Sequence, residues 1–272
     1  MLRTRLITGS VLVGLLLTLL FGLPLYYQIG VLTLVIAGGG YEWAKLSGLS
    51  KLPALIFAVV VVVLCGLLQS FRAALMLPLL FTVLGLWLVQ LQNIFYYPKK
   101  VVAPLFCMPG NLATGLLMLV ATWGALSSIL GTNQGVEWLL QLLLIVIATD
   151  TGAYLVGRQW GRAKLVPQLS PAKTWLGLIG GVSAGTLTAL GAGYLLGTAQ
   201  AIHFALLSGF VISFFAVLGD LTESLYKRLA GVKDSGNLLP GHGGVLDRID
   251  SLMAAGPAFA LYLFYLLNIP LP

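Results

Sequence analysis

The chain has 272 residues, of which 59% are hydrophobic and 8% are charged, and its formal net charge is +7. Soluble domains contain about a quarter charged residues, so this composition excludes a water-soluble globule and indicates a multi-pass membrane protein. The basic residues form no exposed stripe with interleaved aromatic residues, so we expect no nucleic-acid partner.

Apolar runs separated by charged or Pro/Gly-rich breaks predict the membrane-spanning elements. Runs of about 20 apolar residues cross a bilayer as helices, which satisfy their own backbone groups. We therefore predict an all-α integral membrane protein with about nine transmembrane helices. We expect residues 1–110 to form an N-terminal region of transmembrane helices and residues 111–272 to form a C-terminal transmembrane catalytic domain. The predicted spans are 5–24, 29–46, 53–70, 73–96, 111–131, 137–156, 176–196, 202–220 and 251–269.

The basic residues indicate the orientation of these helices. With nine spans, all of the 15 Lys and Arg residues except Arg72 fall on one side of the membrane. Lysine and arginine are enriched in cytoplasmic loops, so this side is expected to be cytoplasmic. We predict a multi-pass protein of the cell (inner) membrane with its N-terminus and its active-site loops in the cytoplasm.

Most of the acidic residues gather in one part of the chain. Acids near or inside membrane spans are costly and usually functional. Asp150 lies in the apolar run LLLIVIATDTGAYLVG, where a helix–helix hydrogen bond is an equally open interpretation. The six acids between positions 150 and 250 are Asp150, Asp220, Glu223, Asp234, Asp247 and Asp250.

Two polar connections, 157–177 and 219–250, combine Lys and Arg with Gly, Pro and Ser. Glycines let backbone N–H groups approach an anion, and the basic side chains supply charge. Ser170 to Thr174 resembles a helix start whose free N–H groups could hold phosphate. A basic loop lying beside anionic lipid is the alternative interpretation.

Acidic side chains stand at the ends of two predicted spans, at helical spacing with a lysine. Magnesium prefers a few carboxylates together with substrate phosphates and water, so two such helix ends at one membrane face could hold Mg²⁺. The alternative is a set of ion pairs on a solvated loop. The residues are Asp220 at the end of the eighth span, Glu223, Ser224 and Lys227 after it, and Asp247 and Asp250 before the ninth.

His242 lies in the sequence PGHGG, where the flanking glycines would let a ligand come close. It could bind phosphate or act as an acid or base, and an incidental histidine in a tight turn remains an equal alternative. Zinc is not expected, because no cysteine lies nearby.

Residues 224–250, SLYKRLAGVKDSGNLLPGHGGVLDRID, resemble the signature of the phosphatidate cytidylyltransferase (CDP-diglyceride synthase) family. Two upstream blocks, DTGAYLVGRQWGR from Asp150 and SPAKTWLGLIGG from Ser170, resemble further motifs of that family. The resemblance is strong over the C-terminal half of the chain. One departure is Leu176, where the family usually has an acid after SPxKTx.

The resemblance implies the synthesis of CDP-diacylglycerol and pyrophosphate from CTP and phosphatidic acid in phospholipid biosynthesis. It implies Mg²⁺ held by Asp220 and Asp247, with K⁺ as a second ion, and a membrane-embedded homodimer. The catalytic residues that it implies are Asp220, Asp247, Lys227, Lys233 and His242. The substrate-binding residues that it implies are Ser170, Lys173, Thr174, Ser224, Arg228, Arg248 and Asp250.

Three other interpretations stay open at this point. A CTP-dependent kinase of polyprenol-type lipids has related needs but releases CDP. An ion transporter would place its acids at mid-bilayer in paired repeats, whereas only Asp150 is deep in an apolar run and no repeat is evident. The third interpretation is a lipid-binding scaffold without activity, which is suggested by Leu176, the departure from the family pattern.

Overall fold

The computed structural model describes residues 14–98, 106–198, 201–236, 238 and 243–270. Residues 14–22 are helical, and nearly all of the described chain forms helices, which confirms the all-α prediction. The elements are α2 (Leu25–Leu46), α3 (Lys51–Ser70), α4 (Arg72–Tyr96), α6 (Met108–Leu130), α7 (Gly135–Trp160), β1 (Lys164–Val166), β2 (Ser170–Thr174), α8 (Trp175–Leu195), α9 (Ile202–Leu229), α10 (Leu246–Leu261) and the π-helix η1 (Tyr262–Leu266).

Seven helices of the described chain are long and apolar enough to cross a membrane: α3, α4, α6, α7, α8, α9 and the continuous segment Leu246–Leu266. Helix α2 is not among them, and it carries two buried polar residues, Gln28 and Glu42. The first predicted span, 5–24, lies partly outside the described residues. The multi-pass architecture is confirmed, and the total of nine spans stays a prediction.

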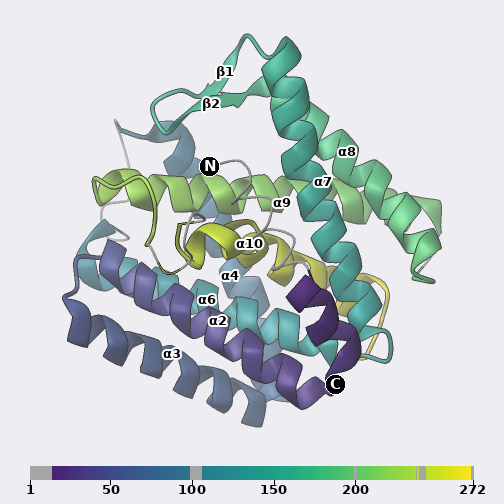
Figure 1. Cartoon of the computed structure of the whole chain (residues 1–272), viewed down its shortest axis with the longest axis horizontal. Coiled ribbons are helices and arrows are strands. Elements are labelled where there is room, and N and C mark those ends of the chain that lie inside the picture. Colours follow the sequence, from purple (N-terminus) through teal and green to yellow (C-terminus); the bar gives the residue numbers. More distant parts are fainter. Residues whose placement is uncertain (1–13, 99–105, 199–200, 237, 239–242, 271–272) are drawn as a thin grey trace.

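Helix α9 runs through the middle of the molecule and divides its neighbours into two groups (Figure 1). Helices α7 and α8 pack on one another and on α9, with the β1–β2 hairpin at one end of this group. Helix α10 packs along α9 on the other side, against α6 and α2, with α3 outside them. The candidate site lies where the two groups meet on α9.

Small residues let α7, α8 and α9 approach closely. A Cβ atom at Gly181 of α8 would lie 2.7 Å from the carbonyl oxygen of Thr149 on α7. A Cβ atom at Gly185 would lie 2.0 Å from the hydroxyl oxygen of Ser213 on α9. Helices in lipid associate through such close backbone contacts. This packing fixes the distance between the polar residues that α7 and α9 carry at their ends.

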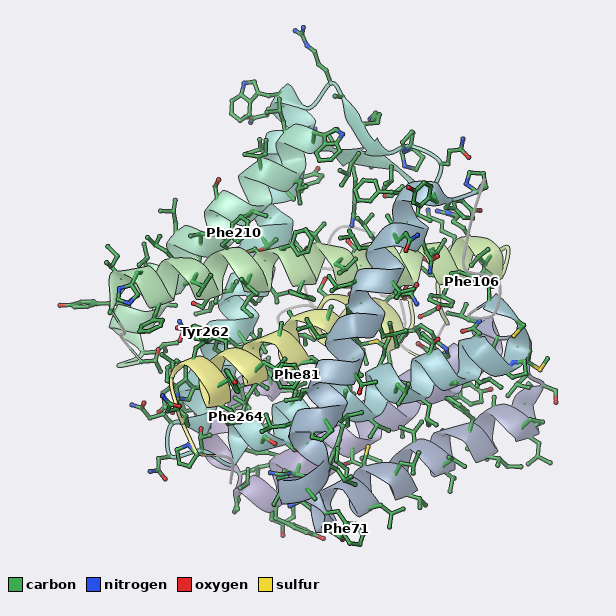
Figure 2. All side chains as sticks on the ribbon, turned by 180° about the vertical axis from the view of Figure 1, so that it is seen from behind. Phe71, Phe81, Phe106, Phe210, Tyr262 and Phe264 are labelled. Atoms are coloured by element: carbon green, nitrogen blue, oxygen red, sulfur yellow. The ribbon has the colours of Figure 1, made fainter. Side chains whose placement is uncertain are left out.

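The outer surface is apolar, as a lipid-facing surface must be. Phe71, Phe81 and Phe210 are exposed and lie on the outside of the helices (Figure 2). A soluble protein would bury most side chains of this size. The exposed aromatic and aliphatic side chains therefore contact the bilayer.

Three predicted helix ends are wrong, because polar residues were taken to end the helices. Helix α7 continues to Trp160, and α9 continues to Leu229, nine residues past the predicted end at 220. Helix α10 begins at Leu246 and not at 251. Polar residues mark where a helix leaves the membrane interior, and these three helices extend beyond that point.

The predicted helix start at Ser170–Thr174 is also wrong. These residues form β2, which pairs antiparallel with β1. The helix begins directly afterwards at Trp175, and Thr174 is its N-cap residue, with a side chain that accepts a hydrogen bond of 3.0 Å from the Gly177 N–H. The cap holds Lys173 at the junction of strand and helix.

Candidate active site

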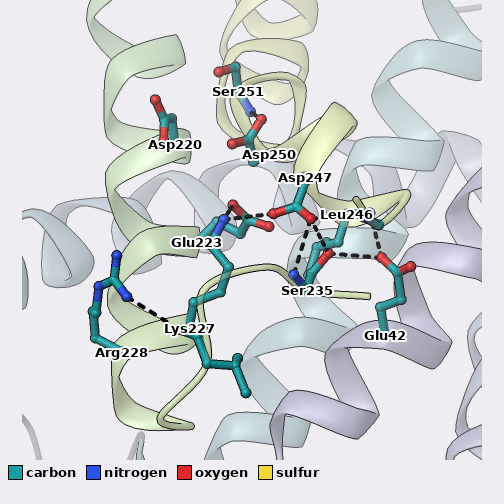
Figure 3. Close-up of polar contacts among 12 residues, drawn as sticks. Glu42, Asp220, Glu223, Lys227, Arg228, Ser235, Leu246, Asp247, Asp250 and Ser251 are labelled. Carbon is teal, nitrogen blue, oxygen red and sulfur yellow. Dashed lines mark hydrogen bonds and ion pairs between the residues drawn. The ribbon is translucent and has the colours of Figure 1, made fainter. Parts of the chain in front are cut away.

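The polar end of α9 carries the first cluster of the site (Figure 3). Glu223 and Lys227 are one helical turn apart, and the Lys227 Nζ atom lies 2.5 Å from Glu223 Oε2. The same Nζ atom lies 2.7 Å from Asp247 Oδ1 on α10. Lys227 therefore bridges two carboxylates and ties α9 to α10. The helical spacing predicted that Glu223 and Lys227 share one face of a helix, and the contact with Asp247 is an addition of the structure.

Asp247 is held from several directions in the first turn of α10. Its Oδ2 atom accepts hydrogen bonds from the Gly244 N–H at 2.8 Å, the Ser235 N–H at 3.1 Å and the Ser235 hydroxyl at 3.0 Å. A carboxylate near a helix N-terminus is also favoured by the helix dipole. The orientation of Asp247 is thus fixed by the protein itself.

A second pair, Lys173 and Asp220, joins the hairpin to α9. The Lys173 Nζ atom lies 2.6 Å from Asp220 Oδ2. Both residues line a cavity of about 630 Å³ between α7, α8, α9 and the hairpin. Ser170 and Thr174, two other predicted substrate-binding residues, line the same cavity. Arg158 and Lys164 add positive charge to its wall.

Two further acids lie near Asp220. Asp150 of α7 lines the same cavity. Asp250 of α10 lies across from Asp220 (Figure 3), and its Oδ1 atom accepts a 2.7 Å hydrogen bond from the Ser251 N–H. The two helices touch here: a Cβ atom at Gly219 would lie 2.3 Å from the Asp250 carbonyl oxygen.

Negative charge exceeds positive charge within this set of side chains. Lys173 and Lys227 supply all the described ion pairs, which involve Asp220, Glu223 and Asp247. The Oε1 atom of Glu223 is buried and has no hydrogen-bond partner in the part of the chain that the structure describes. A buried carboxylate oxygen without a donor is costly, and a cation would remove that cost.

The remaining predicted residues lie in other places. Arg228 is exposed, and its Nε atom donates to the Leu169 carbonyl in the hairpin turn at 3.3 Å. Ser224 is half-buried on α9, while Lys233 and Arg248 are exposed. His242 lies outside the described residues. The roles predicted for these residues stay predictions.

Leu176, the departure from the family pattern, lies in the first turn of α8 and is 44% exposed. It is not among the described residues that line the cavity, whereas its neighbour Gly177 is. The Leu176 side chain therefore forms no part of the cavity wall among the described residues.

Sequence reasoning missed Glu42 and Ser235. Glu42, from α2 in the N-terminal half, is 2% exposed and hydrogen-bonded to Ser235 and to the start of α10. One signal was available: an acid in the Gly-rich apolar run AGGGYEW has to be paired when it is buried. Ser235 gave no signal of its own.

Known proteins provide an independent comparison. A family model described as "Cytidylyltransferase family" matches residues 3–266. The chain belongs to the cytidylyltransferase family.

Individual members of the family are similar to this chain over different lengths of the sequence. The chain is 37% identical over 273 residues to a phosphatidate cytidylyltransferase of Pseudomonas aeruginosa, covering 97% of each chain. It is 46% identical over 147 residues to a phosphatidate cytidylyltransferase of Haemophilus influenzae, covering 49% of this chain and 48% of the relative. A Staphylococcus aureus protein of the same name is 44% identical over 131 residues, covering 48% of this chain and 50% of the relative. Membership of this family makes the chain a nucleotidyltransferase and favours an enzyme over a transporter or a scaffold.

Proposed function

We propose that this protein transfers CMP from CTP to phosphatidic acid, which gives CDP-diacylglycerol and pyrophosphate for phospholipid synthesis. The observation that carries the proposal is the meeting of two lysine–carboxylate groups, Lys173–Asp220 and Lys227–Asp247, beside a cavity within a bundle of membrane helices. Lipid reaches such a place from the bilayer, and nucleotide reaches it from water. The names of the relatives support the same two substrates.

We also propose that the site uses Mg²⁺. The excess of carboxylates and the buried, unpaired Oε1 atom of Glu223 fit a cation. Among the described residues no group of three or more His, Cys, Asp or Glu could hold a metal alone. Substrate phosphates and water would therefore have to complete the shell of the ion, as they usually do for Mg²⁺. Asp220 and Asp247 are the proposed ligands, and K⁺ as a second ion stays a prediction.

The chain's own residues would perform most of the work by positioning and by neutralising charge. A phosphate oxygen of phosphatidic acid attacks the α-phosphorus of CTP, a new P–O bond forms, and the bond to the β-phosphate oxygen breaks to release pyrophosphate. The attacking oxygen is already anionic near neutral pH, so no strong base is needed. When bound, the metal would stabilise negative charge on the phosphates.

The obstacle to this reaction is the repulsion between two polyanions. Lys173, Arg158 and Lys164 offer positive charge from the cavity wall, and preorganised charges of this kind supply much of the catalysis of phosphoryl transfer. Lys173 is paired with Asp220 at the cavity wall. An arriving phosphate would exchange with Asp220 and free this carboxylate to face the cation.

We place the protein in the inner membrane with the site facing the cytoplasm. The support is the bacterial origin of the relatives and the concentration of Lys and Arg on the site's side of the predicted spans. The homodimer stays a prediction, which the mass of the protein in detergent would check.

The test is a product assay on detergent-purified protein with phosphatidic acid, CTP and Mg²⁺, beside an Asp247→Asn variant. We expect CDP-diacylglycerol and pyrophosphate from the parent, and a loss of roughly 100-fold or more in the variant, the scale typical of removing one charge-stabilising group. Glu137→Gln changes an acid in the first turn of α7, at the end of this helix opposite the cavity residue Arg158, and is the control.

Each other outcome has a definite meaning. Release of CDP together with a phosphorylated lipid would overturn the proposal in favour of a lipid kinase. Full activity in the Asp247→Asn variant would keep the reaction and remove Asp247 from it. A folded parent that forms no lipid nucleotide would overturn the reaction itself.

A further inference from the structure

Glu42 is a buried acid that lies outside the cavity yet contacts the segment that carries Asp247. Its Oε1 atom accepts from the Val245 N–H at 3.1 Å, and its Oε2 atom accepts from the Leu246 N–H at 2.8 Å. Oε2 also lies 3.0 Å from the Ser235 hydroxyl oxygen. The first N–H groups of a helix have no partner within the helix, so Glu42 satisfies the start of α10 from a different helix (Figure 3).

The surrounding backbone is shaped to hold this carboxyl group. A Cβ atom at Gly236 would lie 2.3 Å from Glu42 Oε1, and one at Gly244 would lie 2.3 Å from Glu42 Oε2. No side chain other than hydrogen fits at either position without displacing Glu42. Two separate glycines of the site segment thus leave room for one acid from the N-terminal half of the chain.

Glu42 is connected to Asp247 through Ser235. The Ser235 hydroxyl lies 3.0 Å from Glu42 Oε2 and 3.0 Å from Asp247 Oδ2. The hydroxyl has a single hydrogen to donate, so its orientation depends on both carboxylates. Glu42 also fixes the first backbone turn of α10, from which Asp247 projects.

We propose that Glu42 is a positioning residue for the transfer reaction: through Ser235 and the first turn of α10, it holds Asp247 in the orientation that binds the cation. The inference rests on the proposed function of Asp247. Glu42 itself is not among the described residues that line the cavity between α7, α8, α9 and the hairpin, so it acts through other groups. Residues that orient a metal ligand typically change metal affinity by about 10- to 100-fold when mutated.

The first measurement is Mn²⁺ binding to purified protein with CTP and without phosphatidic acid, detected by electron paramagnetic resonance. Substrate phosphates can then complete the metal shell, and no turnover occurs. Mn²⁺ stands in for Mg²⁺, and this readout does not depend on turnover. We expect Glu42→Gln to weaken Mn²⁺ binding by about 10- to 100-fold, because in either orientation the amide NH₂ group would face a backbone N–H, that of Val245 or that of Leu246. Glu137→Gln, the same chemical change outside the site, is expected to bind like the parent.

The second measurement is the Mg²⁺ dependence of activity. We expect Glu42→Gln to raise the half-saturating Mg²⁺ concentration by a similar factor, with activity recovering at high Mg²⁺. A merely structural role would lower the folded fraction and leave the Mg²⁺ concentration for half activity unchanged. That result in Glu42→Gln would overturn the proposal.

A second variant tests the connection and covers the case in which Glu42→Gln does not fold. Ser235→Ala removes the hydroxyl and keeps the contacts of Glu42 with the backbone. It is expected to weaken Mn²⁺ binding in the same direction, and the double variant is expected to show less than the sum of the two effects, since both act through one contact. Parent-like Mn²⁺ binding in Ser235→Ala would show that Ser235 does not link Glu42 to Asp247.

The outcomes separate this inference from the proposed reaction. A parent that binds Mn²⁺ but makes no CDP-diacylglycerol would end the proposed reaction and leave the role of Glu42 standing on its metal readout. A parent that binds no Mn²⁺ would end the positioning role, even if it makes the product.

Discussion

The site contains two lysine–aspartate ion pairs. The distances between the lysine Nζ and aspartate Oδ atoms are similar, but the surroundings of the two pairs differ. Lys227 and Asp247 have side chains that are 13% and 10% exposed, and Asp247 accepts three further hydrogen bonds from Ser235 and Gly244. Lys173 and Asp220 are 25% and 32% exposed and line a cavity. The Lys227–Asp247 pair is therefore built into the fold, whereas the Lys173–Asp220 pair is open to exchange its partner for a ligand.

The largest effect is expected when the buried pair is broken. Lys227→Met would leave Glu223 and Asp247 without their shared cation, and a buried charge left alone costs about 3–5 kcal/mol. Lys173→Met breaks a partly exposed pair, which contributes about 0–1 kcal/mol. Thermal or denaturant unfolding in detergent would measure the two stabilities, and the product assay would measure their activities.

Both lysine variants are expected to lose activity, but only Lys227→Met is expected to lose much stability. Equal losses of stability in the two variants would remove the distinction between the pairs. Full activity in Lys173→Met would show that the exposed pair does not meet substrate.

An intermediate effect is expected where the two helices of the site touch. Gly219→Ala would place a Cβ atom 2.3 Å from the Asp250 carbonyl oxygen, and such overpacking costs about 1–3 kcal/mol. It would also move Asp250 away from Asp220 and lower the activity. Unfolding and product formation would both be measured.

Gly191→Ala in α8 is the matched control, since a Cβ atom there meets nothing within 4 Å. In a helix this change is expected to be neutral or to stabilise by about 0.5–1 kcal/mol. If Gly219→Ala and Gly191→Ala have the same stability and the same activity, the close contact of α9 with α10 is not needed for the site.

The smallest effect is expected when the N-cap of α8, next to Lys173, is removed. Thr174→Ala removes the N-cap of α8, which costs about 1 kcal/mol, and loosens the position of Lys173 next to it. We expect a higher KM for CTP with a smaller change in kcat. Thr174→Ser keeps the capping hydroxyl and is expected to resemble the parent, so a loss in the serine variant as large as in the alanine variant would argue against the cap.

The membrane helices could be predicted because long apolar runs have few other stable forms in lipid. Their ends could not, because Glu223 and Lys227 are polar and yet continue α9 to Leu229. The hairpin was missed for a related reason. Its strands are three and five residues long, and Ser170–Thr174 carries no alternation of apolar and polar side chains that would indicate a strand.

The contact between Glu223 and Lys227 could be predicted from spacing, since the two residues are one helical turn apart. Asp247 follows Lys227 by 20 positions, and only the family motif that contains both residues indicated that they belong to one site. Glu42 could not be predicted in either way. Its partners lie in the segment 235–246, and only the packing of α2 on α10 brings them together. A local pattern contains no information on which distant helix supplies a missing acceptor.

The bond between Leu246 and Glu42 spans 204 positions of the chain. During synthesis, α2 leaves the ribosome about 200 residues before α10, so this bond forms only after α10 has emerged. Until then Glu42 lacks the backbone donors that it accepts from in the folded protein. On the proposed function, the onset of CTP turnover therefore reports that α10 has reached its place beside α2.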